Sequence, residues 1–146
     1  MQLDELIARE EIRTLIARYN QAGDRGKLGE LVACFSEEGV LELEDMPPLR
    51  GRAAIQRHLD GVVVDLAAAT TRATLRHHVS SILIETQLPD AADARCYFAV
   101  YTEVGLDHWG RYSDHFTRVD GVWSIARRRV RVDGAAPESR MVWSAP

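Results

Sequence analysis

Thr74-Leu75-Arg76-His77-His78-Val79-Ser80-Ser81-Ile82-Leu83-Ile84-Glu85, near the middle of the chain, sets the fold class. Apolar and β-branched residues dominate this stretch, and a turn-like Leu88-Pro89-Asp90 run follows it, so we expect a β-strand. Side chains alternate between the two faces of a strand. The residues expected on the face of His77 are Leu75, Val79, Ser81 and Leu83, and those expected with His78 are Arg76, Ser80, Ile82 and Ile84.

The two histidines are therefore expected to point in opposite directions. Next to the pair, the face of His77 is the more apolar one, so we expect His77 to point into the core or a cavity and His78 to point outward. Histidine is the side chain whose unperturbed pKa lies nearest neutrality, which makes an inward histidine a candidate for proton transfer. A hydrogen-bonded core histidine without chemistry is the alternative.

The chain before residue 73 has a helical pattern. Apolar residues recur at three- and four-residue spacings, as they do on the buried face of a helix. The elements expected there are a helix from Leu3 to about Ala22, a shorter helix with Leu28, Leu31, Val32 and Phe35 on one face, a strand over Glu38–Glu44, and a helix from about Arg52. Gly23-Asp24-Arg25-Gly26 separates the first two helices.

After residue 73 the hydrophobic period changes from 3.6 to 2, which is typical of strands. The strands expected after the His77 strand cover Ala94–Gly105, Trp109–Val119 and Val122–Val132. Asp120-Gly121 is a strong signal for a two-residue hairpin, while Asp90–Asp93 and Leu106-Asp107 are expected to form looser turns. Three helices followed by a meander of long antiparallel strands predict an α+β fold, with the helices packed on one face of a strongly curved sheet around a pocket.

Length and composition limit the possible functions. At 146 residues the chain is expected to be one domain over 1–146, with a core over about 3–133 and a tail over 134–146. The net charge of −4, from 18 basic and 22 acidic residues, gives no footprint for nucleic acid or for an anionic membrane surface. No apolar run approaches the roughly 18 residues that span a bilayer, and the Met1–Glu5 start lacks a secretory pattern, so we expect a cytoplasmic protein.

The cysteines and the motif content point to no bound group. Cys34 and Cys96 have no metal-ligand spacing. Buried, reduced thiols fit a cytoplasmic protein, and a single disulfide is the alternative. Nothing in the sequence resembles a phosphate loop, a nucleotide fingerprint, a nucleophile elbow or a metal-binding helix motif. We therefore expect no cofactor and no metal.

Tyr19, Asp24 and His77 are the candidate catalytic residues. Tyr19 and Asp24 lie five positions apart around the end of the first helix, where both could face the mouth of a curved sheet. An aspartate that holds an imidazole fixes its tautomer and raises its basicity, and a phenol can donate a proton or polarise a carbonyl. Asp24 could instead cap the second helix, and Tyr19 could be an amphipathic core residue.

Aromatic residues of the last two strands are the candidate substrate contacts: Tyr112, Phe116 and Trp123. Along the strand that holds the first two, alternation puts Tyr112, Asp114 and Phe116 on one face and Arg111, Ser113 and His115 on the other. The Arg127–Arg131 run is expected to be a solvated strand rather than an anion site.

Several motifs together resemble the SnoaL-like group of the nuclear transport factor 2-like superfamily. The motifs are Glu10-Glu11-Ile12-Arg13 with Tyr19 and Asp24, Gly51-Arg52-Ala53-Ala54-Ile55, Arg76-His77-His78-Val79-Ser80, Gly110-Arg111-Tyr112-Ser113-Asp114, and Asp120-Gly121-Val122-Trp123-Ser124-Ile125. The resemblance covers about residues 3–133 and implies a cone-shaped α+β barrel with a deep pocket. It is much less specific for activity, because relatives include dehydratases, isomerases, cyclases, dehydrochlorinases and non-catalytic subunits.

The resemblance also implies roles for single residues. Scytalone dehydratase-like and bile-acid dehydratase-like enzymes pair an aspartate after the first helix with a histidine on the strand after the third, which matches Asp24 and His77. The bile-acid group adds a tyrosine that matches Tyr19. Where scytalone dehydratase has a second catalytic histidine, an asparagine and two tyrosines, this chain has Glu103, Tyr112, Gly23 and Leu43. Scytalone dehydration itself is therefore not expected.

The residues and the resemblance together suggest a cofactor-independent lyase or isomerase for a hydrophobic cyclic molecule such as a polyketide, steroid or terpenoid. His77 would remove a proton next to a carbonyl, Asp24 would stabilise the protonated imidazole, and Tyr19 would bind the carbonyl or leaving oxygen. The alternative is a non-catalytic small subunit or ligand-binding module, like the small subunits of aromatic-ring dioxygenases. We also expect a homo-oligomer that associates through the sheet at 94–105 and 122–132.

Overall fold

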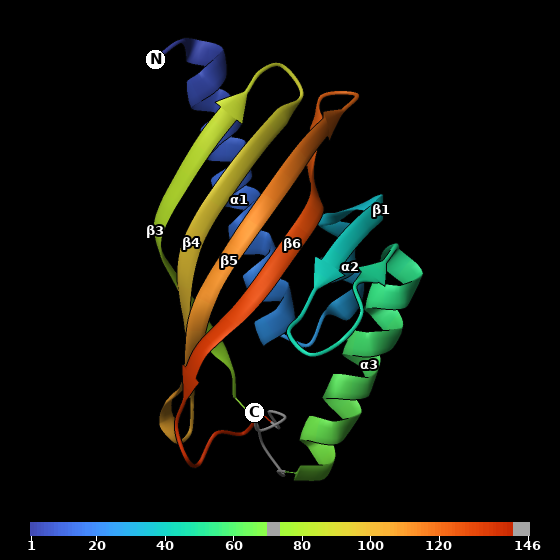
Figure 1. The fold of residues 1–146 in the computed structure, drawn as a ribbon, viewed down its shortest axis with the longest axis vertical. Helices are drawn as coiled ribbons and strands as arrows, with labels where there is room; N and C mark the ends of the chain where they lie inside the picture. The colour runs from blue at the N-terminus through green and yellow to red at the C-terminus, as the bar shows by residue number, and fades with distance from the viewer. Residues whose placement is uncertain (70–73, 142–146) are drawn as a thin grey trace.

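Three helices and one six-stranded sheet make up the computed structural model, which describes residues 1–69 and 74–141 (Figure 1). The helices are α1 (Leu3–Asp24), α2 (Leu28–Ala33) and α3 (Arg52–Ala69); the strands are β1 (Phe35–Glu42), β2 (Leu49–Arg50), β3 (Arg76–Gln87), β4 (Ala91–Thr102), β5 (Gly105–Val119) and β6 (Val122–Ala135). The predicted α+β class, with helices before the long strands, is confirmed. The two-residue strand β2 was not predicted.

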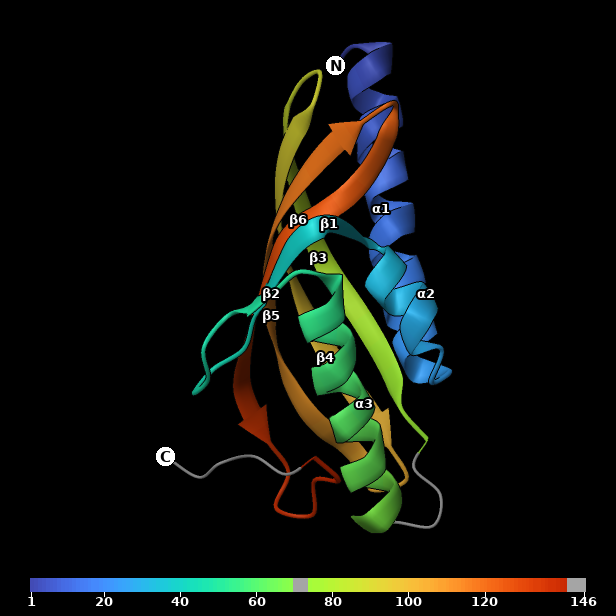
Figure 2. The same ribbon diagram turned by 90° about the vertical axis from the view of Figure 1, so that its right-hand side faces the viewer.

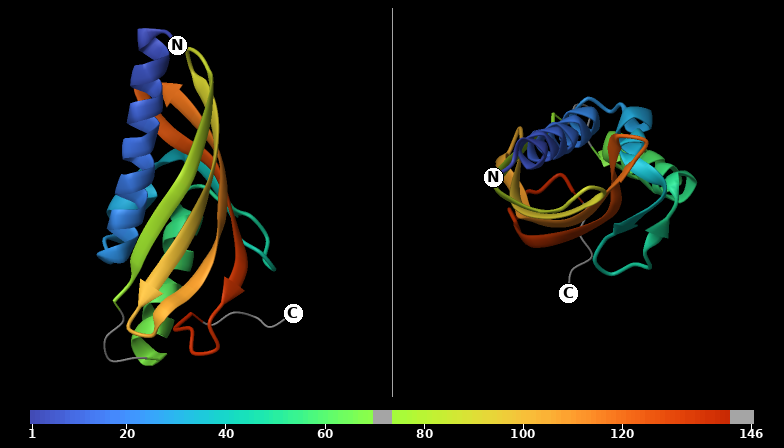
Figure 3. Two further views of the ribbon diagram at one scale, coloured as in Figure 1. Left: turned by 90° about the vertical axis from the view of Figure 1, so that its left-hand side faces the viewer. Right: turned by 90° about the horizontal axis from the view of Figure 1, so that it is seen from above.

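The sheet has the strand order β2-β1-β6-β5-β4-β3. The strands from β3 to β6 form the predicted antiparallel meander, but β1 pairs with β6 in parallel, so the sheet is mixed rather than purely antiparallel. A parallel pair needs a long connection, and here α3 and the rest of the meander supply it. Seen from above, the sheet curves as an arc with α1 along its open side (Figure 3), and α1 covers one side of the sheet (Figure 2).

The core lies between α1 and the inner face of the sheet. The apolar residues at three- and four-residue spacings along α1 are buried: Ala8, Ile12, Leu15, Ile16, Tyr19 and Ala22. They meet buried side chains from the strands, which include Phe35, Ile84, Phe116 and Ile125. Burying each such side chain stabilises the fold by about 1.5–3 kcal/mol, so this contact determines where α1 lies.

Two predicted turns are confirmed, at Leu88-Pro89-Asp90 and at Asp120-Gly121, and two are wrong. Val119 pairs with Val122 across Asp120 and Gly121, whose φ angles of 50° and 78° are those that a tight primed turn requires. Leu106-Asp107, in contrast, lies inside β5, because the chain reverses before Gly105, and Asp107 is fully buried. The expected Asp90–Asp93 turn ends early, since β4 already begins at Ala91.

A β-bulge in β3 reverses the predicted faces halfway along the strand. His77 and Val79 point inward and His78 is exposed, as expected. The register then shifts between Ser80 and Leu83, around Ser81 with a φ of 51°. Beyond this point Ile84 is buried and Leu83 is 52% exposed, so the prediction that Ser81 and Leu83 share the face of His77 is wrong. An extra residue in one strand moves every later side chain to the other face.

Other expectations concern the cysteines, the tail and bound groups. Cys34 and Cys96 are both buried and free, which confirms the prediction of reduced thiols. The tail is described up to Met141, and its first two residues continue β6; residues 142–146 lie outside the described part. Across residues 1–69 and 74–141, no helix is long and apolar enough to cross a membrane. The same residues contain no cluster of three His, Cys, Asp or Glu side chains that could hold a metal ion.

Candidate functional site

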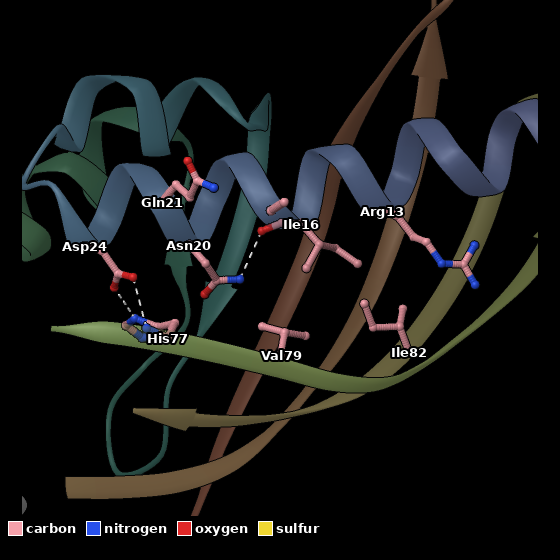
Figure 4. Close-up of a pocket in the computed structure, with 9 residues that line it drawn as sticks. Arg13, Ile16, Asn20, Gln21, Asp24, His77, Val79 and Ile82 are labelled. Atoms are coloured by element: carbon pink, nitrogen blue, oxygen red, sulfur yellow. Dashed lines mark hydrogen bonds and ion pairs between the residues drawn. The ribbon is translucent and has the colours of Figure 1, made fainter. Parts of the chain in front are cut away.

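A pocket of about 240 Å³ lies between α1 and the edge strand β3 (Figure 4). Its wall on α1 is a single helical stripe of residues spaced three or four apart: Arg13, Ile16, Ala17, Asn20, Gln21 and Asp24. Its wall on β3 consists of His77, Val79 and Ile82. The pocket exists because an amphipathic helix crosses the open edge of a curved sheet, so that one stripe of α1 meets one face of β3.

Asp24 and His77 meet at one end of this pocket. The Oδ1 atom of Asp24 lies 2.6 Å from Nδ1 of His77, and its Oδ2 atom accepts a 3.0 Å hydrogen bond from the His77 backbone N–H. The predicted contact between the two side chains is therefore confirmed. The capping interpretation of Asp24 is wrong, because Asp24 is the last residue of α1 and the N-cap of α2 is Lys27, which makes no side-chain cap.

Because of the contact with Asp24, the two ring nitrogens of His77 differ in protonation. An ionised carboxylate only accepts hydrogen bonds, so Nδ1 carries the proton that Asp24 binds, and Nε2 of the neutral ring is then a proton acceptor. None of the described residues hydrogen-bonds to Nε2. The His77 and Asp24 side chains are 21% and 11% exposed, which keeps their interaction largely shielded from water. Chemically, the pair can take up a proton at Nε2 while the aspartate stabilises the imidazolium.

Asn20 joins the pocket to the interior of the sheet. Its side chain is buried, its Nδ2 donates to the Ile16 carbonyl at 3.0 Å, and its Oδ1 accepts a 3.2 Å hydrogen bond from the Tyr112 hydroxyl. Tyr112 stacks on Phe98, whose ring centroid lies 6.4 Å from that of His77. The predicted substrate contact Tyr112 thus lies behind the pocket wall and reaches the pocket through Asn20.

Arg128 is a buried residue of the Arg127–Arg131 run. Its guanidinium is fully buried, lies between the rings of Tyr19 and Tyr112 at 4.1 and 4.0 Å, and donates to both Asp114 oxygens at 2.8 and 2.7 Å. Burial alone lowers the pKa of Arg128, but the Asp114 charge and hydrogen bonds outweigh it and raise the pKa. The prediction that the whole Arg127–Arg131 run is solvated is wrong at this position, where β6 turns the side chain inward.

The remaining predicted site residues lie in the core rather than around the pocket. Tyr19 is buried, packs edge-on against Phe35 and Tyr112, and is not among the pocket-lining residues. Burial raises the pKa of the Tyr19 phenol, with the Arg128 charge acting against it, so the phenol stays protonated at neutral pH. Phe116 and Trp123 are likewise buried in the main core. Their contact with a substrate stays a prediction.

The structure also contains a second aspartate–histidine pair that the sequence reading missed. Oδ1 of Asp107 lies 2.7 Å from Nδ1 of His108, and the same carboxylate accepts hydrogen bonds from Thr102 Oγ1, Ser139 Oγ and the Arg140 backbone N–H. Burial alone raises the pKa of Asp107, but these hydrogen bonds lower it overall; for His108, burial lowers the pKa. Through its hydrogen bonds with Ser139 and Arg140, Asp107 joins the tail to β5.

The two histidines lie in one row across the sheet. His77 pairs with Val100 on β4, and Val100 pairs with His108 on β5. Neighbouring strands are about 4.8 Å apart, which puts the two backbone positions roughly 10 Å from each other. The sequence signal for this pair was the Asp107-His108 dipeptide at the start of an alternating strand. The prediction of a turn at Leu106-Asp107 hid this signal.

Comparisons with known proteins agree with the fold. The sequence pattern of the SnoaL-like domain matches residues 4–129. No curated protein is significantly similar in sequence. Among solved structures, a nuclear transport factor 2-like protein with a cystatin-like fold from Novosphingobium aromaticivorans is 29% identical, with a TM-score of 0.78 over 94% of this chain and 90% of that one.

Two further structures share the fold at lower identity. A putative scytalone dehydratase from Novosphingobium aromaticivorans is 22% identical, with a TM-score of 0.76 over 100% of both chains. A hexachlorocyclohexane dehydrochlorinase of the LinA-type3 kind from Novosphingobium barchaimii is 18% identical, with a TM-score of 0.77 over 99% of both chains. At these identities the likeness concerns the fold.

Proposed function

This chain belongs to the SnoaL-like domain family, and we propose that it is a cofactor-independent lyase or isomerase that removes a proton from a small hydrophobic cyclic molecule. The observation that carries this proposal is the 2.6 Å contact between Asp24 and Nδ1 of His77 in the wall of a largely apolar pocket. A general base needs a free acceptor atom and a partner that stabilises its protonated form, and Nε2 of His77 with Asp24 beside Nδ1 meets both needs.

In the proposed reaction, Nε2 of His77 takes a proton from a carbon next to a carbonyl. The C–H bonding pair then forms the enolate, and Asp24 stabilises the imidazolium that results. In an isomerase the imidazolium returns the proton to another carbon of the same molecule. In a lyase the electron pair expels a leaving group from the neighbouring carbon, and the imidazolium can protonate it. General acid–base catalysis of this kind contributes on the order of 10²–10⁴-fold in rate.

The fold relatives support elimination as the more specific form of this proposal. Two of them are named for eliminations, as a putative scytalone dehydratase and as a dehydrochlorinase. The volume of about 240 Å³ also limits the substrate, because ordinary ligand pockets measure about 300–1,000 Å³. A molecule with one or two rings fits this volume better than a complete steroid.

Hydrogen exchange tests the proposal without knowledge of the natural product. A cyclic ketone such as 2-tetralone is incubated in D₂O with the protein, and deuterium uptake next to the carbonyl is followed by NMR. We expect catalysed exchange with the unmodified protein and a 10²–10⁴-fold loss with Asp24→Asn and with His77→Gln. The double variant should be little worse than either single one, because residues that act as a unit are not additive.

His78→Gln is the matched control, since His78 is the adjacent histidine and is exposed. This variant should exchange deuterium at the rate of the unmodified protein. If ketones bind but the unmodified protein accelerates exchange of none of them, the proton-removal proposal fails and a ligand-binding domain is the remaining interpretation. Equal losses with His78→Gln and His77→Gln would also contradict the proposal.

A further inference from the structure

The pocket changes character along its length, and this change concerns the substrate of the proposed function. Arg13 and Asp24 stand at opposite ends of the lining stripe of α1. Their positions differ by eleven residues, which corresponds to about 16 Å along a helix axis. The two ends therefore contact different parts of any molecule that fills the pocket.

The middle of the pocket is apolar and its ends are not. In the middle section Ile16 on α1 lies opposite Val79 on β3, and Ile82 lies nearer to Arg13 (Figure 4). At one end lies the Asp24–His77 pair with the amide side chains beside it. At the other end, the only charged group that lines the pocket within the described residues is Arg13. This is the pattern of a site for an amphipathic molecule.

Arg13 is not used to hold the fold together. One turn earlier, Arg9 donates to Glu5 and, at 2.5 Å, to the carbonyl of Ile84, so this arginine joins α1 to β3. Arg13 forms no ion pair or side-chain hydrogen bond with any residue in the described part of the chain, and Glu10, one turn before it, does not pair with it either. Its guanidinium can therefore bind an anion without losing a structural contact.

We propose that the pocket binds an elongated hydrophobic carboxylic acid, with its carboxylate on Arg13, its apolar body over Ile16 and Val79, and its far end, which carries the reacting carbon, toward His77. This inference rests on the proposed function for the reacting end only. A guanidinium offers paired donors that match the two oxygens of a carboxylate. The negative charge of Asp24 lies at the opposite end of the lining stripe, about 16 Å from Arg13 along the helix axis.

A pair of matched probes tests the proposal. 2-Naphthoate and 2-naphthamide share two rings and nearly the same shape, but only the first carries a charge. Isothermal titration should show tighter binding of 2-naphthoate by the unmodified protein. Arg13→Gln should weaken 2-naphthoate about 10-fold, as expected for the loss of a charged hydrogen-bond partner, and should leave 2-naphthamide within about 2-fold.

Arg18→Gln is the matched control, because Arg18 lies on the same helix, is exposed, and does not line the pocket. It removes the same charge and should change neither affinity. Ala17→Phe tests the location, because a ring at this exposed position fills the middle of the pocket and should abolish binding of both probes. As a second test of location, 2-naphthoate should shift the methyl NMR signals of Val79 and Ile82 in the unmodified protein.

Three results would overturn the proposal: equal weakening of both probes by Arg13→Gln, no weakening of 2-naphthoate by this variant, or no shift at Val79 and Ile82. The experiment is independent of the dyad. His77→Gln should lose ketone exchange and still bind 2-naphthoate, because the carboxylate contact lies at the other end. A failure of the Arg13 contact therefore differs from a failure of proton removal.

Discussion

Asp114→Asn should be one of the most damaging single substitutions in this protein. Asp114 and Arg128 are both fully buried at their side chains, and two hydrogen bonds of 2.8 and 2.7 Å join them. The asparagine has nearly the same shape and can accept only one of these hydrogen bonds through its single oxygen. It removes the negative charge, so the guanidinium between the two tyrosine rings is left without its counter-ion.

The size of the effect follows from burial. Breaking a buried ion pair by removing one partner costs about 3–5 kcal/mol, because the remaining charge stays desolvated. A domain has a free energy of unfolding of only about 5–15 kcal/mol, so the loss is a large part of the total. For a chain of about this length, 1 kcal/mol shifts Tm by about 2–4 °C, which gives a fall of about 6–20 °C for Asp114→Asn.

Urea unfolding followed by circular dichroism measures the loss, and two further variants test its cause. Asp93→Asn removes an exposed carboxylate that pairs with His115 and should cost less than about 1 kcal/mol. Asp114→Leu combined with Arg128→Met removes both charges and should recover most of the stability lost in Asp114→Asn. If Asp114→Asn costs less than 1 kcal/mol, or the double variant is less stable than the single one, the buried pair does not act as described.

Two other predictions concern β5. The pKa values of Asp107 and His108 are both lowered in the folded protein, so the unfolded chain binds more protons at low pH. The free energy of unfolding should therefore fall as the pH drops below about 6.5, the ordinary pKa of histidine. In urea titrations, His108→Gln should flatten this dependence between pH 6.5 and 5. An unchanged slope would contradict it. Gly110→Ala should cost more stability than Gly134→Ala. The methyl group added at Gly110 meets the Arg131 backbone, whereas the one added at Gly134 meets only the ring of the partly exposed Trp109. The reverse order of stability in thermal melts would refute this.

The sequence alone predicted the elements that local patterns specify. The stripe of α1 from Ala8 to Ala22 is buried as its period requires. The Asp120-Gly121 hairpin forms because few other residue pairs adopt two positive φ angles at low cost. The contact between Asp24 and His77 joins residues 53 positions apart, and periodicity supplied only the inward face of His77. The resemblance to a known family supplied the partner.

Features that depend on distant parts of the chain were not predictable in this way. Alternation cannot locate the bulge at Ser81, because the sequence of β3 fits an unbroken strand equally well. The charge of Arg128 predicted a solvated side chain. Its burial is possible because Asp114 on the neighbouring strand supplies the opposite charge. Asp107 resembles a turn residue, yet hydrogen bonds from the tail allow it to be buried in β5.

Asp24 has a structural role and a proposed catalytic role, and a different carboxylate oxygen serves each role. Oδ2 accepts the backbone N–H of His77, which would otherwise lack a partner because β3 is an edge strand, and Oδ1 binds Nδ1. An asparagine can keep the first contact with its oxygen, but its NH₂ group then faces Nδ1 and donates to it. The ring proton must move to Nε2, the atom that has to accept the substrate proton. Asp24→Asn therefore preserves the junction between α1 and β3 while it reverses the tautomer of His77, whereas Asp24→Ala would lose both contacts.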